Sequence, residues 1–95
     1  MTDNKKYNLH LYVSGIVQGV GFRFFTIHRA EIYGITGWVK NSYDGRVEID
    51  AEGEKQNLLL LIKDIQIGPR SADVSAVNEE WHEISFNRYN SFGLS

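Results

Sequence analysis

Hydrophobic and polar residues alternate in several segments of the chain, a period of two that is typical of half-buried β-strands. The pattern predicts strands over residues 9–14, 35–41, 46–52 and 72–83. In the third of these, the polar positions are Arg46, Glu48, Asp50 and Glu52, which predicts one face open to solvent. In the fourth, the alternation changes phase at residues 76–77, which indicates a β-bulge. The apolar positions Phe92 and Leu94 allow a short last strand.

Two other segments repeat apolar residues at helical spacing. The first stripe consists of Phe22, Phe25, Ala30 and Tyr33, and the second of Leu58, Leu61, Ile62 and Ile65. Gly34 and Gly68 are placed to end the two helices. The order strand–helix–strand–strand–helix–strand predicts an α+β fold, a ferredoxin-like split βαβ sandwich with an antiparallel sheet and both helices on one face. We expect a flexible tail at residues 1–7 and a single domain over 8–95.

The loop between the first strand and the first helix, residues 15–23, contains three of the nine glycines of the chain. Glycines allow successive backbone amides to point at one object, and a helix N-terminus adds free amides and partial positive charge. The helix start lacks a capping side chain and an acidic first turn, and Arg23 lies at the unfavourable end of the helix dipole. A bound anion would accept hydrogen bonds from the uncapped amides, supply the missing negative charge and pair with Arg23. The alternative is that Arg23 pairs with an acidic residue from the second half of the chain.

Asn41 ends the second predicted strand, three residues before the Asp44–Gly45 sequence that predicts a hairpin turn. In the predicted fold, the side chain of Asn41 could reach the mouth of the 15–23 loop. An amide offers donors and an acceptor without titrating, so it can hold a water molecule in place. The alternative is that Asn41 only satisfies backbone groups of the turn.

At these positions the chain resembles the acylphosphatase family. The resemblance rests on GIVQGVGFR at 15–23, Ala30, Gly34, GWVKN at 37–41 and DGRVE at 44–48, and it continues with AEG at 51–53 and GPR at 68–70. The last residues, FGLS, lack the terminal arginine that family members often carry.

The resemblance implies a hydrolase that converts acyl phosphates to a carboxylate and inorganic phosphate by in-line attack of a water molecule. Arg23 would bind the phosphoryl group and Asn41 would orient the water. The residues expected to hold the phosphate oxygens are Gly15, Ile16, Val17, Gln18, Gly19, Val20, Gly21, Phe22 and Arg23. Inorganic phosphate is then both product and competitive inhibitor.

Charge supports an anion site in the first half of the chain. The total is −2, which predicts no general affinity for nucleic acid or membrane. Residues 4–43, however, carry five bases and one acid, whereas residues 44–83 carry ten acids and four bases. An anion would therefore prefer the first half.

The composition of the chain argues against several other kinds of site. At 95 residues with 42% hydrophobic and 23% charged residues, the chain has an ordinary globular composition. The absence of cysteine excludes disulfides and thiolate chemistry. His10, His28 and His82 lack metal-ligand spacing, so we expect no metal and no cofactor. Without a secretory signal or a membrane span, we expect a cytoplasmic protein. A domain of this size can stand alone, so we expect a monomer.

The aromatic residues are interpreted as packing groups. Phe22, Phe24 and Phe25 are expected to lie mainly in the core beneath the loop, and Trp38 and Trp81 to pack on the sheet. Two other functions stay open from the residues themselves. One is an anion-binding module without catalysis, and the other is an RNA- or protein-interaction domain, which would need a basic or apolar sheet face.

Overall fold

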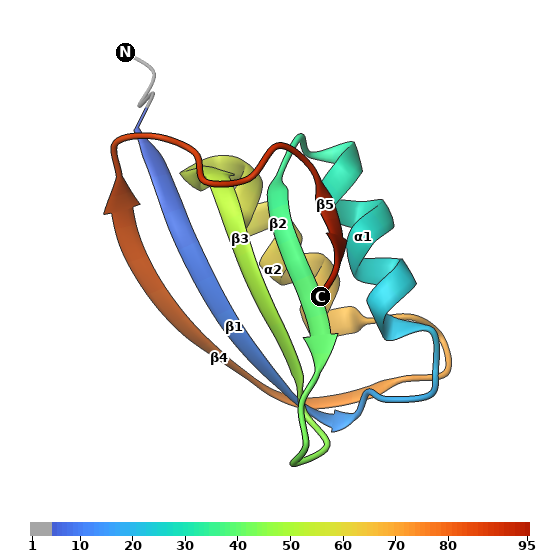
Figure 1. Ribbon diagram of the computed structural model, residues 1–95. Coiled ribbons are helices and arrows are strands. Elements are labelled where there is room, and N and C mark those ends of the chain that lie inside the picture. The colour runs from blue at the N-terminus through green and yellow to red at the C-terminus, as the bar shows by residue number, and fades with distance from the viewer. Residues whose placement is uncertain (1–4) are drawn as a thin grey trace.

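The computed structural model describes residues 5–95, which form five β-strands and two α-helices (Figure 1). In chain order these are β1 (Lys6–Ile16), α1 (Phe22–Ile32), β2 (Thr36–Asn41), β3 (Val47–Glu54), α2 (Lys55–Ile67), β4 (Asp73–Ile84) and β5 (Phe92–Leu94). The predicted order of strands and helices is confirmed, and the short last strand is present as β5. Within residues 5–95, neither helix is long and apolar enough to cross a lipid bilayer.

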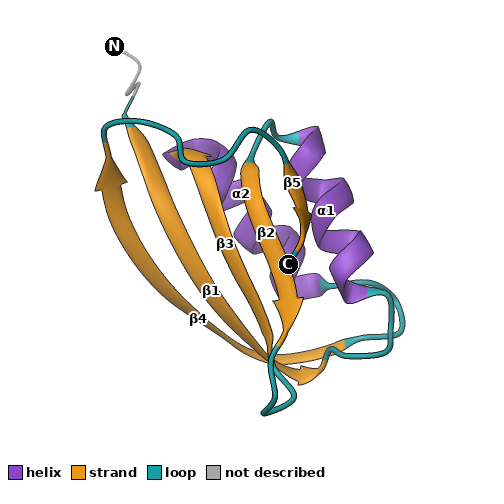
Figure 2. Ribbon diagram, in the orientation of Figure 1, coloured by secondary structure: helices purple, strands orange, loops and turns teal. Residues whose placement is uncertain are grey.

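The strands form one sheet in the order β4-β1-β3-β2-β5, and both helices pack on the same face of it (Figures 1 and 2). The three pairs that join β4, β1, β3 and β2 are antiparallel. Strand β5 runs parallel to β2, so the sheet is mixed. This is the predicted ferredoxin-like α+β fold, with a parallel edge strand added to the antiparallel sheet that we expected.

The core lies between the sheet and the two helices. Its fully buried side chains include Leu9, Leu11, Val13, Val39, Val47, Ile49 and Ala51 from the strands and Phe22, Ala30, Leu58, Leu61 and Ile65 from the helices. Each large side chain stabilises the fold by roughly 1.5–3 kcal/mol relative to an exposed position. Within this layer α1 packs against β2 and β5, and α2 packs against β3 and β4.

The first strand begins earlier than the sequence pattern suggests. Lys6 and Tyr7, which we expected in the tail, pair with residues of β3 and β4. The ring of Tyr7 also meets that of Trp81 edge to face at 6.0 Å. These contacts order a polar segment whose own pattern gives no strand signal. Residues 1–4, the rest of the expected tail, lie outside the described residues.

A β-bulge lies where β4 passes the end of β1, close to the predicted position. Ser14 pairs with Ala76 but Gly15 pairs with Val74, so Ser75 is the extra residue of β4. Gly15 has φ +123°, and a Cβ atom there would lie 2.1 Å from the carbonyl oxygen of Asp73. Glycine is therefore required at this close approach, from which the chain enters the loop.

The polar face of β3 is less exposed than predicted. Asp50 and Glu52 are only 5% and 1% exposed. The segment between β4 and β5 crosses this face and covers them, with the backbone amide of Arg88 and its Nε donating to Glu52 at 2.8 and 2.7 Å. The polar side chains of β3 alternate as predicted, but two of the four on the expected solvent face are buried under a segment whose sequence has no periodic pattern.

Candidate functional site

The loop between β1 and α1 delivers unpaired backbone amides to the start of the helix. Gly21 is the N-cap residue in a left-handed conformation with φ 78°, which a residue with a Cβ atom rarely adopts. No side chain caps the helix, and its first turn has no acidic residue. Among residues 5–95, the amides of residues 18–21 have no hydrogen-bond acceptor. The helix start thus offers several donors and the positive end of a dipole.

Arg23 brings a positive charge to the same place. Its side chain is half-buried, and within the described part of the chain no carboxylate forms an ion pair with it. Two acids of the second half of the chain pair with other arginines: Asp64 with Arg29 at 2.8 Å, and Asp50 with Arg88 at 2.9 Å. The alternative in which Arg23 pairs with an acidic residue is therefore wrong for residues 5–95.

Asn41, the last residue of β2, lies at the same cavity as Arg23. The cavity has a volume of about 100 Å³. The side chains and glycines that line it are Val17, Gly19, Gly21, Phe22, Arg23, Phe24 and Asn41. A guanidinium, an amide and free backbone donors around a space of this size can hold a tetrahedral oxyanion and a water molecule.

Other residues of the predicted loop lie around this cavity rather than in its wall. Gly15 is held against β4, and Ile16 is 61% exposed. Val20 packs against the core. The side chain of Gln18 turns to the β2–β3 turn, where Nε2 donates to the carbonyl oxygens of Ser42 and Arg46 at 2.8 and 2.9 Å. The loop thus divides into residues that line the cavity and residues that hold it in place.

Phe24 is a lining residue that sequence reasoning assigned wrongly. It was expected in the core with Phe22 and Phe25, but it is 67% exposed. Phe22 is buried and Phe25 packs against the core, so these two expectations are confirmed. A helix can direct only part of each turn inward, and Phe24 lies between the two inward positions. The position of Phe24 next to Arg23, in the first turn of α1, was the sequence signal that could have assigned it to the cavity.

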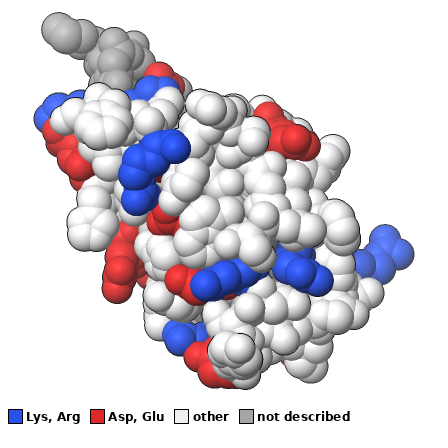
Figure 3. All heavy atoms as spheres, viewed as in Figure 1, with Lys and Arg blue, Asp and Glu red and all other residues white. Residues whose placement is uncertain are grey.

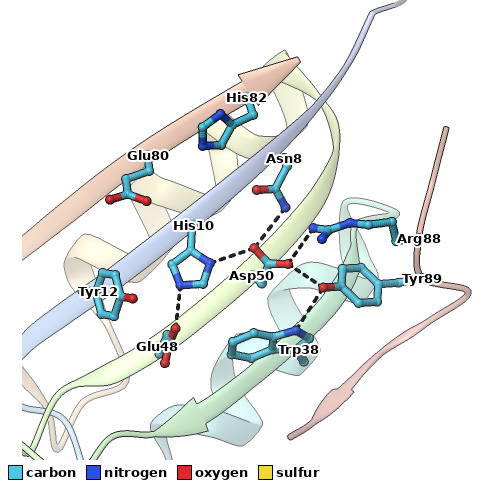
Figure 4. Close-up of a pocket in the computed structure, with 10 residues that line it drawn as sticks. All are labelled: Asn8, His10, Tyr12, Trp38, Glu48, Asp50, Glu80, His82, Arg88 and Tyr89. Carbon is cyan, nitrogen blue, oxygen red and sulfur yellow. Dashed lines mark hydrogen bonds and ion pairs between the residues drawn. The ribbon is translucent and has the colours of Figure 1, made fainter. Parts of the chain in front are cut away.

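A second, wider hollow of about 460 Å³ lies on the open face of the sheet. Figure 4 shows Asp50 at its centre, with four side chains directed at the carboxylate. Asp50 accepts hydrogen bonds from Asn8 at 3.0 Å, His10 at 2.8 Å, Arg88 at 2.9 Å and Tyr89 at 2.6 Å. These donors come from β1 and from the segment before β5, so the cluster ties that segment to the sheet.

His10 lies between two carboxylates in this cluster. Its Nδ1 is 2.8 Å from Asp50 and its Nε2 is 2.6 Å from Glu48. Burial alone would lower the pKa of His10, but the two hydrogen bonds outweigh burial and raise it above 6.5. Burial would likewise raise the pKa of Asp50, but the hydrogen bonds from Tyr89, His10 and Asn8 outweigh it and lower that pKa.

The buried polar groups at the centre of the open face satisfy one another, which separates this hollow from the loop cavity. Figure 3 views this face and shows basic and acidic side chains side by side over its middle. Within residues 5–95, no buried side-chain nitrogen or oxygen lacks a partner, and no group of three potential ligands could hold a metal ion. Free binding groups are found instead at the loop cavity, with Arg23. Sequence reasoning did not single out Arg88 and Tyr89, which lie in a segment without periodicity.

Comparison with known proteins shows similarity over most of the chain. The family model described as Acylphosphatase matches residues 9–93. An acylphosphatase of Caldanaerobacter subterraneus subsp. tengcongensis is 42% identical over 89 residues, which cover 94% of this chain and 98% of that protein. The crystal structure of an acylphosphatase from Bacillus subtilis matches with a TM-score of 0.89 at 34% identity, covering 94% of this chain and 98% of that one. The structure of an acylphosphatase from Coxiella burnetii matches with a TM-score of 0.86 at 40% identity, covering 100% of both chains.

Proposed function

This chain belongs to the acylphosphatase family and is a hydrolase of acyl phosphates, and from this premise we propose that the 15–23 loop and Arg23 hold the phosphoryl group of its substrate. The observation that carries the proposal is the half-buried Arg23 side chain, which has no ion-pair partner within residues 5–95 and lies at a cavity shared with Asn41. A guanidinium is permanently charged, and its planar donors match phosphate oxygens in pairs. The free amides of the loop and helix start donate to the same oxygens.

The reaction follows from these groups. The side-chain amide of Asn41 holds a water molecule in line with the bond between phosphorus and the acyl oxygen. The water oxygen forms a bond to phosphorus while that bond breaks, and the acyl group leaves as a carboxylate. A phosphate oxygen accepts the proton of the water. The carboxylate is a good leaving group, so positioning and charge stabilisation carry the step without a strong general base.

The residues of the cavity support catalysis without a metal or other cofactor, because Arg23 and the loop amides supply the positive charge that phosphoryl transfer requires. Inorganic phosphate carries the same oxygens as the transferred group. It therefore acts as a competitive inhibitor as well as a product.

The decisive experiment measures the release of inorganic phosphate from benzoyl phosphate, with and without a chelating agent. We expect turnover that the chelator does not change, and competitive inhibition by added phosphate. Phosphate should also raise the melting temperature, because it binds only the folded chain. Stabilisation by phosphate without turnover would instead indicate an anion-binding module, and loss of turnover on chelation would contradict the metal-independent mechanism.

A further inference from the structure

Phe24 is an aromatic residue at the loop cavity that core packing does not explain. Its neighbours Phe22 and Phe25 contact each other at a ring separation of 6.0 Å on the core side of α1. The ring of Phe24 is 67% exposed and lines the cavity beside Arg23. Because the exposed ring stands at the wall of the cavity, it is available to contact a molecule bound there.

The cavity walls have two kinds of chemistry. Arg23, Asn41 and the glycine backbone supply charge and hydrogen-bond donors, whereas Val17, Phe22 and Phe24 supply apolar surface. An acyl phosphate has the same two parts, a charged phosphoryl group and a carbon chain or ring. The polar part of the cavity suits the first and the apolar part suits the second.

The size of the cavity places the acyl group at its rim. The volume is about 100 Å³, whereas an engineered apolar cavity that binds benzene measures about 150 Å³. A phosphoryl group therefore fills most of the space, and a larger acyl group must extend beyond it. Phe24 both lines the cavity and is largely exposed, so its ring stands where such a group leaves the cavity.

We propose that Phe24 contacts the acyl group of the substrate and selects acyl phosphates with an aromatic or other bulky apolar acyl group over acetyl phosphate. The proposal rests on the function proposed above and specifies the substrate class of the same site. Two aromatic rings in contact gain about 0.5–1.5 kcal/mol beyond the burial of their area, so the ring of Phe24 should favour an aromatic substrate by up to about tenfold. A methyl group is too small to make the same contact.

The test compares kcat/KM for benzoyl phosphate and acetyl phosphate in the parent protein, Phe24→Ala and Phe24→Leu. In Phe24→Ala we expect the ratio of the two values to fall by about 2- to 10-fold, with the inhibition constant of inorganic phosphate unchanged. Phe24→Leu, which keeps apolar surface without the ring, should give an intermediate ratio. The matched control is Phe86→Ala, because Phe86 is 75% exposed and lies outside the cavity.

The possible outcomes distinguish the role of Phe24 from the proposed function. An unchanged ratio in Phe24→Ala, or equal losses for both substrates, would overturn the role of Phe24 while leaving the proposed function intact. Failure of the parent protein to hydrolyse either substrate would overturn the proposed function itself. Because Phe24 is exposed, both variants should keep the parent's melting temperature to within a few degrees, which excludes unfolding as the cause of a changed ratio.

Discussion

The side-chain amide of Gln18 donates a hydrogen bond of 2.8 Å to the carbonyl oxygen of Ser42, the residue that follows Asn41. The same nitrogen lies 2.9 Å from the carbonyl oxygen of Arg46, on the other side of the β2–β3 turn. Ser42 and Arg46 are themselves joined, since the amide of Ser42 donates to Arg46 at 2.8 Å. One side chain therefore connects the loop that leads to Arg23 with the strand that carries Asn41.

Replacing Gln18 by Ala removes this connection, and we expect kcat/KM for acyl phosphates to fall about tenfold, because two hydrogen bonds contribute about 1–3 kcal/mol in total. The fall should be larger in kcat than in KM, since the distance between the phosphate and the water on Asn41 is what changes. Steady-state kinetics with benzoyl phosphate measures both. The matched control is Gln66→Ala, an exposed position on α2. Equal losses in the two variants would contradict the positioning role of Gln18.

Replacing Arg23 by Gln should weaken binding of inorganic phosphate and raise KM by about 10- to 150-fold. This range follows because a hydrogen bond to a charged group contributes about 1.5–3 kcal/mol. Arg23→Lys should lie between Gln and the parent, because lysine keeps the charge but loses the paired donors. Inhibition constants for phosphate measure the effect directly. Lys63→Gln removes one positive charge from an exposed position on α2 and should leave both constants unchanged. Full phosphate affinity in Arg23→Gln would contradict the assignment.

Replacing Asn41 by Ala should lower kcat by about 100-fold, because a reactant that is out of place, here the water molecule, costs about that factor. Phosphate inhibition should change little. The amide is proposed to hold the water and not the phosphate. Single-turnover kinetics and phosphate inhibition separate the two effects. Asn78→Ala, at an exposed position of β4, makes the same change away from the cavity. A large loss of phosphate affinity with normal kcat would assign Asn41 to phosphate binding instead.

The periodic parts of the fold could be predicted from the sequence, because burial of one face imposes a period on each element. The helix that begins near Phe22 and the strand that ends at Asn41 are examples, and together they bring Arg23 and Asn41 to one cavity. Arg23 was recognisable since its charge conflicts with the helix dipole, and a residue that breaks a local rule often has a functional reason.

The contacts that depend on distant segments could not be predicted. The burial of Asp50 and Glu52 requires Arg88 and Tyr89 to cross the sheet, and nothing in the local pattern of either segment specifies that crossing. The role of Gln18 depends in the same way on the carbonyl oxygens of the β2–β3 turn. The exposure of Phe24 depends on how α1 is rotated about its own axis. Residues 22, 24 and 25 are all aromatic, so apolar spacing alone does not show which of them faces the core.

Replacing Gly15 by Ala should destabilise the fold by about 2–5 kcal/mol, which combines backbone strain with overpacking. The new Cβ atom would lie 2.1 Å from the carbonyl oxygen of Asp73 and 2.8 Å from the amide nitrogen of Ser75, at a backbone φ of +123°. Urea unfolding measures the change in free energy. The control is Gly93→Ala, where a Cβ atom meets nothing within 4 Å and φ is not positive. Similar stability of the two variants would contradict the close approach at the bulge.

The stability of the protein should fall as the pH rises from 6 to 9, and His10 should be the main cause. A neutral imidazole has one N–H, whereas both ring nitrogens of His10 face carboxylate oxygens, so the doubly protonated ring fits this site. Because the pKa of His10 is raised in the folded state, its contribution is complete below pH 6.5 and is lost as the pH rises through the folded pKa. Asp50, whose pKa is lowered, loses its contribution only in acid, below its ordinary value of 3.8.

Urea unfolding at several pH values between 6 and 9 tests this, with His10→Gln as the variant. We expect His10→Gln to be less stable than the parent at pH 6 by about 1–3 kcal/mol, the value of charged hydrogen bonds lost to Asp50 and Glu48, and the difference to shrink towards pH 9. His28→Gln, on the exposed side of α1, should keep the parent's pH dependence. A difference between His10→Gln and the parent that stays constant from pH 6 to 9 would show that His10 acts by packing and not by its charge.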